Sequence, residues 1–113
     1  MQNGTDKKSN SLLGKAESLE NLVNYREGSV VSRTILKQKS GNITLFAFDK
    51  GEELSEHTTP FDAFVYIIEG EAAITISGKP QILTKGDMII MPAGKPHAVY
   101  AQKRFKMALV MIK

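Results

Sequence analysis

Short apolar runs, each closed by a turn signal, fill the chain from Gly28 to its end and constrain its fold more than any other feature. The breaks between the runs are rich in Gly, Pro, Ser, Asn and Lys, and residues 69–71 interrupt the longest run. No run is long enough for an interior helix, and period-two alternation with frequent turns is typical of strands. The pattern predicts an all-β sandwich or barrel with these strands: SVVSRTILKQ, ITLFAFD, FVYIIEGEAAITIS, QILT, DMIIM, HAVYAQ and FKMALVMIK.

The residues before Gly28 have a different pattern. The segment AESLENLVNY, residues 16–25, places Leu19, Leu22 and Val23 at helical spacing, which predicts one short helix that ends by Gly28. Residues 1–14 are mostly polar, and we expect them to form a flexible leader. Residues 15–113 are then expected to form a single barrel domain, because 113 residues is close to the size of one domain.

Three of the predicted strands are apolar at consecutive positions, in residues 64–68, 88–91 and 108–112. Successive side chains of a strand point to opposite faces, so both faces of these strands need cover. One face can line a barrel, but one short helix is too small to cover the other face of three strands. We therefore expect a symmetric homodimer.

Composition narrows the classes of partner. The 15 basic and 12 acidic residues are scattered without long runs of one sign, so nucleic-acid binding is not expected. The absence of cysteine excludes disulfides, thiolate metal sites and cysteine nucleophiles. No stretch approaches the roughly 18 apolar residues of a membrane span. We therefore expect a cytoplasmic protein without a membrane partner.

The chain has only two histidines, His57 and His97, and both stand beside turn residues at the edge of a predicted strand. Imidazole is the commonest protein metal ligand and titrates closest to neutral pH. Two converging histidines could bind a metal ion or exchange protons, whereas an isolated histidine is more often a packing residue. Composition alone leaves both interpretations open.

The segment GEELSEHTTPFDAFVYIIEG resembles the first sequence motif of the cupin superfamily. Five residues separate Gly51 from His57, and six residues separate Ala63 from Gly70, which is the spacing of that motif. The glycines suit turn and bulge positions that need unusual backbone angles.

The segment GDMIIMPAGKPHAVYA resembles the second cupin motif through Gly86, Pro92, Gly94 and His97. Fifteen residues lie between the two motifs, as in small single-domain microbial cupins of the cupin 2 conserved barrel type. The resemblance implies an all-β cupin jelly-roll barrel, here with a short N-terminal helix, and it implies a metal site at the barrel mouth.

The sequence departs from the family at half of the implied ligand positions. Thr59 stands where the family has its second histidine and Ala63 where it has glutamate, and these are the two changed ligand positions. Ala101 also stands where the second motif ends in asparagine. The resemblance then carries over only His57 and His97 as metal ligands. Two imidazoles fall short of the three protein ligands of catalytic zinc and of the iron facial triad, so we expect a loosely held divalent ion, with zinc, nickel or copper favoured over iron or manganese.

The residues around the histidines are expected to form an apolar pocket. Replacing glutamate and asparagine by alanine removes polar groups from the interior, which predicts a larger and more apolar cavity. The expected pocket residues are Thr59, Ala63, Val65, Val99 and Ala101.

Three functions are open at this point. The first is a module that binds a small molecule, with or without the loosely held metal. The second, also implied by the resemblance, is a metal-dependent enzyme of the dioxygenase, isomerase or decarboxylase class acting on a small organic substrate, for which the sequence assigns no catalytic residue. The third is a structural or regulatory domain that only dimerises.

Several other side chains are assigned to packing. Tyr66 and Tyr100 are expected on the strand face opposite the site, and Asp62, next to the lost glutamate position, is also expected to face away. Methionine is a soft copper ligand, but in apolar strands it is far more often a core residue, so packing is the preferred interpretation. The methionines concerned are Met88, Met91, Met107 and Met111.

Overall fold

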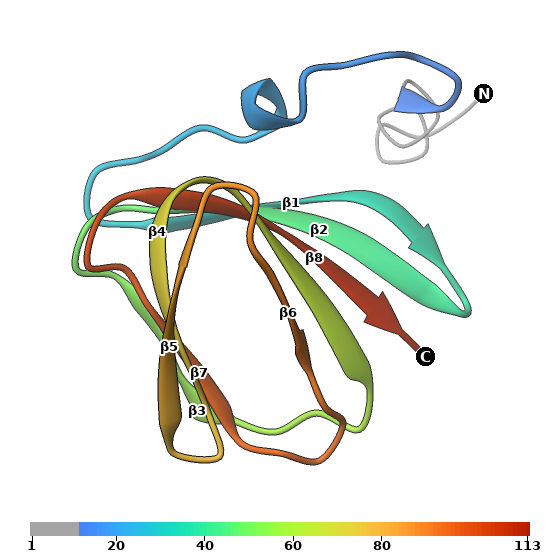
Figure 1. Cartoon of the computed structure of the whole chain (residues 1–113). Coiled ribbons are helices and arrows are strands. Elements are labelled where there is room, and N and C mark those ends of the chain that lie inside the picture. Colours follow the sequence, from blue (N-terminus) through green and yellow to red (C-terminus); the bar gives the residue numbers. More distant parts are fainter. Residues whose placement is uncertain (1–11) are drawn as a thin grey trace.

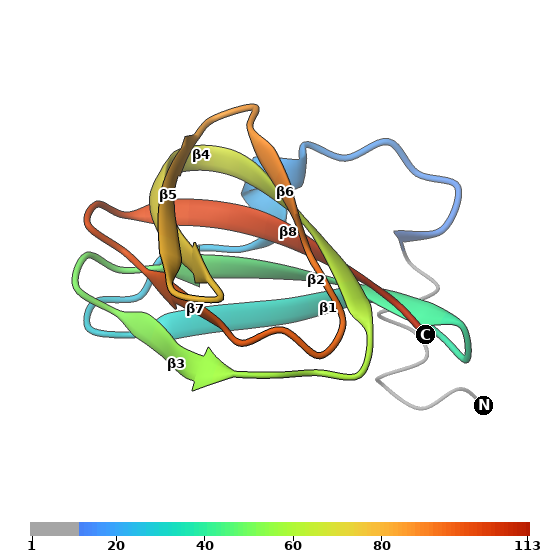
Figure 2. The same ribbon diagram turned by 60° about the horizontal axis from the view of Figure 1, so that its bottom comes forward.

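The computed structural model describes residues 12–113, so most of the predicted leader lies outside the described residues. The described part is built from strands that curl into an open-ended barrel (Figures 1 and 2). No helix in residues 12–113 is long and apolar enough to cross a membrane. The strands are β1 (Val30–Gln38), β2 (Gly41–Phe48), β3 (Glu53–His57), β4 (Asp62–Ile76), β5 (Lys79–Thr84), β6 (Met88–Met91), β7 (His97–Tyr100) and β8 (Phe105–Ile112).

The long strand β4 joins the two halves of the barrel. Its first half pairs with β8 and β6, and its second half, from Glu71, pairs with β5 and β7. The hydrogen-bonded order β1-β2-β8-β4-β7-β3 therefore runs across both halves, as expected for a jelly roll, and all of these pairs are antiparallel.

The break predicted at residues 69–71 is an irregularity inside one strand and not a strand end. The pairing of β4 with β8 shifts register between Ile67 and Glu69, and Gly70 has a φ of +82°. A Cβ at Gly70 would collide with the backbone carbonyl oxygen of Arg104. The glycine thus lets β4 bend from one half of the barrel to the other while β8 passes close to its backbone.

The N-terminal helix is shorter than the sequence pattern predicts. It consists of one 3-10 turn, η1 (Leu19–Leu22), without a side-chain cap from Ser18. A 3-10 helix has three residues per turn, so Leu19 and Leu22 lie on the same side and both face the sheet. Between Val23 and β1 the chain has no regular secondary structure. Packing on the sheet stabilises the N-terminal segment more than helix propensity does.

Two apolar clusters form the core. The larger one fills the barrel interior and includes the stacked rings of Phe48 and Phe105, whose centroids are 4.4 Å apart. The smaller one lies on the outer face of the sheet, where Val23 and the residues of η1 cover Leu45 and Ala108. Figure 1 shows this N-terminal segment crossing above β1, β2 and β8.

An apolar strip on the outer sheet face is only partly covered by the described N-terminal segment. In one row across β2, β8, β4 and β6, Ile43 pairs with Val110, Val110 with Phe64, and Phe64 with Ile90. Ile90 is 55% exposed. This apolar strip, together with exposed Met88 and Ile112, extends beyond the reach of η1.

Candidate functional site at the barrel mouth

His57 and His97 lie side by side at the open end of the barrel. His57 ends β3, His97 begins β7, and the two residues are direct partners in the antiparallel pairing. Their rings meet edge to face, with centroids 4.4 Å apart and an interplanar angle of 66°. The structure therefore brings the two sequence-predicted ligand residues together. His57 is exposed at the rim, whereas His97 is buried.

A backbone carbonyl group contacts one nitrogen of each ring. The Nδ1 atom of His57 is 2.7 Å from the carbonyl oxygen of Ser55, and that of His97 is 3.3 Å from the carbonyl oxygen of Lys95. A carbonyl oxygen can only accept, so each Nδ1 atom carries a proton, and in the neutral ring the Nε2 atom carries a lone pair. Neither Nε2 has a hydrogen-bond partner within the described chain. Metal-binding histidines are commonly oriented in this way.

The loop before His97 is held from the other side of the barrel mouth. The carboxylate of Asp62 accepts a hydrogen bond of 2.8 Å from the backbone N–H of Ala93, and the N–H of Gly94 donates to the carbonyl oxygen of Thr59 at 2.7 Å. Gly94 has a φ of +76°, which suits glycine. Asp62 faces away from the cavity, as predicted, and has a positioning role that strand alternation does not reveal.

A small cavity lies beneath the two histidines. Its volume is about 50 Å³, room for an ion with one or two waters and far below the roughly 300–1,000 Å³ of a typical organic ligand pocket. Apart from the two imidazoles and one threonine, the lining is apolar. The lining residues are Leu54, His57, Thr59, Ala63, Met91, His97, Val99, Met107, Leu109 and Met111.

The predicted pocket residues divide into two groups. Thr59, Ala63 and Val99 line the cavity. Val65 and Ala101 do not line it, although they belong to the same buried barrel core as Ala63 and Val99. Val65 is the next residue of β4 after Ala63 whose side chain points into the barrel. The backbone of Ala101 forms hydrogen bonds with residues 51 and 52.

The hydroxyl group of Thr59 is already engaged in a local turn. It donates to the carbonyl oxygen of Phe61 at 2.9 Å and accepts from the N–H of the same residue at 3.2 Å. Because this hydroxyl already donates one hydrogen bond and accepts another, only one of its lone pairs is free. Thr59 is therefore a poor substitute for the imidazole that the family has at this position.

Methionines occupy the space beside the lost glutamate. Ala63 pairs with Met91 of β6 on one side and with Met111 of β8 on the other. Met107 also lines the cavity, whereas Met88 is 47% exposed and lies outside it. The cavity lining beside the lost glutamate is apolar, and Met91, Met107 and Met111 contribute to it. Sequence reasoning placed all four methionines in the core, which is wrong for exposed Met88, and it had no signal that the other three line the cavity with the histidines.

Burial and charge both favour the neutral form of His97. Burial is the larger cause that lowers its pKa below the ordinary 6.5, and repulsion by His57 adds to it, while the hydrogen bond to Lys95 acts in the opposite direction. At neutral pH the imidazole of His97 is uncharged, and its Nε2 atom is able to accept a hydrogen bond or coordinate a cation.

The family's metal centre does not fit the residues present. Within residues 12–113 no three His, Cys, Asp or Glu side chains are grouped so that they could hold a metal ion. The carboxylate of the family motif is absent, and Thr59 is a weak replacement for the missing imidazole. Two imidazoles alone give a weaker and more open donor set.

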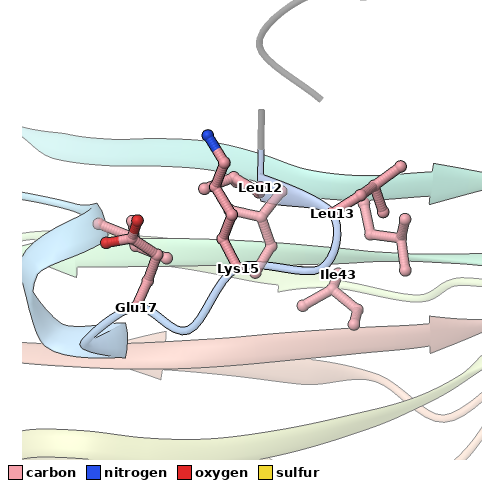
Figure 3. A pocket seen from close by; sticks show the side chains of 8 residues that line it. Leu12, Leu13, Lys15, Glu17 and Ile43 are labelled. Atoms are coloured by element: carbon pink, nitrogen blue, oxygen red, sulfur yellow. The ribbon is translucent and has the colours of Figure 1, made fainter. Parts of the chain in front are cut away.

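A second pocket lies apart from the histidines. It has a volume of about 270 Å³ and lies between the N-terminal segment and the sheet. Figure 3 shows Leu12, Leu13 and Ile43 among its lining residues, with Lys15 and Glu17 beside them. This pocket has no grouped polar side chains directed at a common point, so we do not place the functional site there.

The fold and the site together define a small jelly-roll barrel with a histidine pair at its mouth. Residues 44–113 match the family model of the cupin domain, which is more than half of the chain. The chain belongs to the cupin family.

Solved structures of similar length agree with this assignment. A conserved protein of unknown function from Streptococcus pyogenes is 40% identical, with 88% of each chain covered and a TM-score of 0.84. A cupin superfamily protein from Desulfitobacterium hafniense is 32% identical, with 88% of this chain and 91% of that chain covered and a TM-score of 0.83.

Other relatives match over only part of their length. A cupin 2 conserved barrel domain protein from Leptotrichia buccalis is 38% identical over 84% of this chain, with a TM-score of 0.81, and the match covers 46% of that protein. An uncharacterised protein from Streptomyces coelicolor is 27% identical over 55% of this chain and 59% of its own length. The chain thus spans just over half of that curated relative.

Proposed function

We propose that this cupin is a binding protein whose ligand is held by the Nε2 atoms of His57 and His97. The observation that carries the proposal is the orientation of the two rings: each Nδ1 is tied to a backbone carbonyl oxygen, which leaves two lone pairs at the barrel mouth. The complementary ligand is either a cation or a small molecule that offers hydrogen-bond donors. A loosely held zinc, nickel or copper ion meets this requirement.

The shape of the cavity favours binding of a small ligand. About 50 Å³ accommodates an ion with its waters, and the open rim beside exposed His57 leaves room for a few further atoms outside. Two imidazoles without a carboxylate give modest affinity for a divalent ion. The protein is therefore proposed to exchange its ligand readily.

Metal titration tests the proposal. Zinc binding is measured by competition with a chromophoric chelator for the wild type, for His57→Ala, for His97→Ala and for the double variant. Glu56→Gln, which changes an exposed side chain next to His57, is the matched control. We expect one zinc ion per chain in the wild type and in the control, a loss of about tenfold or more in each single variant, and no specific binding in the double variant.

A small-molecule arm separates metal binding from direct ligand binding. The proton–nitrogen NMR spectrum of the wild type is recorded with a library of small donor-bearing fragments, in the absence and presence of zinc. Fragments that shift signals of Ala63 and Val99 in the wild type but not in the double histidine variant support the proposal. Zinc and fragment binding that is equal in the wild type and the double variant contradicts it.

A further inference from the structure

The position that lost its carboxylate stands between two thioethers. Ala63 is the direct partner of both Met91 and Met111, and directly paired residues point to the same face of a sheet, with Cβ atoms about 4.5–5.5 Å apart. All three residues line the cavity that also contains His57 and His97. The glutamate position of the family is thus replaced by a small side chain flanked by two sulfur-bearing ones.

The lining of this cavity carries no negative charge. The nearest neighbour with a carboxylate on the same strand, Asp62, faces away and binds the N–H of Ala93. A divalent ion placed here would keep its full charge in a largely apolar surrounding, and the cost of desolvation rises with the square of the charge. A monovalent cation costs about a quarter as much in the same cavity.

The donor types present are also selective. Thioether sulfur and imidazole nitrogen are soft or borderline ligands, and thioethers favour Cu(I) over harder ions. Met91 is 4% exposed and His97 is 5% exposed, so both donors lie in the same shielded region. The lower desolvation cost of a single charge and the soft donor atoms thus both favour a soft monovalent cation.

We infer that the barrel mouth is a site for a soft monovalent cation, represented by Cu(I), bound by the Nε2 atoms of His57 and His97 with thioether sulfur from Met91 and Met111. This inference rests on the proposed function and names the class of ligand that the histidine pair prefers. The ordinary alternative is that the two methionines only fill the volume that the glutamate left.

Leucine variants separate these two roles, because leucine keeps the apolar volume of methionine and removes the sulfur. Cu(I) affinity is measured without oxygen, in the presence of a reductant, by competition with a chromogenic Cu(I) chelator. The variants are Met91→Leu, Met111→Leu and the double variant. Met88→Leu is the matched control, because Met88 lies on the same strand as Met91 but is exposed on the outer face.

We expect the wild type to bind one Cu(I) per chain more tightly than zinc, because thioether ligands favour Cu(I). Met91→Leu and Met111→Leu should each weaken Cu(I) binding about tenfold, with zinc affinity unchanged, and Met88→Leu should bind like the wild type. X-ray absorption of the copper-loaded wild type should show sulfur as well as nitrogen neighbours. A triple leucine variant that also replaces Met107, the third methionine of the lining, should show nitrogen neighbours only. Circular dichroism confirms that each variant is folded.

Other outcomes overturn the inference and separate it from the proposed function. Unchanged Cu(I) affinity in the double leucine variant, or zinc affinity equal to that of Cu(I), overturns the thioether site, and the histidine site stands if His57→Ala and His97→Ala still weaken binding. Cu(I) binding that survives in the double histidine variant overturns both proposals. A wild type that binds neither ion also overturns this inference.

Discussion

His57 and His97 are direct partners across β3 and β7, and their ring centroids lie 4.4 Å apart. Two imidazoles this close repel each other when both are protonated, and burial of His97 adds the larger penalty. We therefore predict that His97 titrates below the ordinary value of 6.5. In His57→Phe its pKa should rise but stay below 6.5, because burial remains. NMR titration of the ring signals measures this, and an unshifted pKa in the wild type would contradict the account.

The lowered pKa of His97 also couples folding to pH. In the folded state His97 binds its proton less readily than in the unfolded chain, so its contribution to stability is full above pH 6.5 and is lost as the pH falls. Chemical unfolding at neutral and acidic pH should show this decrease. His97→Phe should show a smaller decrease.

Tyr25 connects the N-terminal segment to the barrel through a side-chain hydrogen bond. Its hydroxyl donates to the carboxylate of Glu69 at 2.7 Å, and burial, followed by this bond, raises the pKa of the phenol. Tyr25→Phe is predicted to lower the free energy of unfolding by about 1.5–3 kcal/mol, as for a hydrogen bond to a charged group. Tyr100→Phe alters an exposed phenol and should change it by less than about 0.5 kcal/mol. Equal effects in denaturant titrations would argue against this role for Tyr25.

Gly70 permits the bend of β4. Gly70→Ala adds a Cβ at a φ of +82° against the carbonyl oxygen of Arg104, and we predict a loss of about 3–5 kcal/mol in the free energy of unfolding. Gly78→Ala has a similar φ of +80° but open space around it, so about 1–2 kcal/mol is expected. Thermal unfolding of the two variants compares them. A smaller loss at Gly70 than at Gly78 would show that the close approach is relieved elsewhere.

We propose that the chain forms a homodimer and that the apolar strip on the outer sheet face is its contact surface. Ile90 lies in the row with Ile43, Val110 and Phe64 and is 55% exposed. Light scattering should give twice the chain mass of 12.4 kDa for the wild type and the chain mass for Ile90→Lys. Ile82→Lys is the control, because Ile82 is equally exposed but lies on β5. A wild-type monomer, or a dimer that persists in Ile90→Lys, would contradict the proposal.

The sequence predicted most strands correctly because alternating apolar residues and turn signals mark them directly. It did not predict β3, whose residues Glu53–His57 are almost all polar and exposed; this strand forms through its pairing with β7. It also predicted too much helix before Val23. Local pattern is informative for strands with a buried face and uninformative for segments that tertiary contacts alone hold in place.

For the site, motif spacing predicted the two residues that meet, His57 and His97. It did not predict the volume beneath them, because volume depends on side chains from strands far apart in the sequence. In the sequence, alanine in place of glutamate at position 63 suggests a larger cavity. Only the strand pairing shows that Met91 and Met111 lie on either side of Ala63. Val65 and Ala101 likewise match the motif region but do not line the cavity.

The most direct test of the central claim is the long-range proton–nitrogen NMR spectrum of both imidazoles at neutral pH, recorded before and after addition of zinc. The account predicts that Nδ1 of His57 and of His97 carries the proton, and that both Nε2 signals shift on metal binding. Protonated Nε2 atoms, or Nε2 signals that do not respond to the metal, would contradict a binding site formed by this histidine pair.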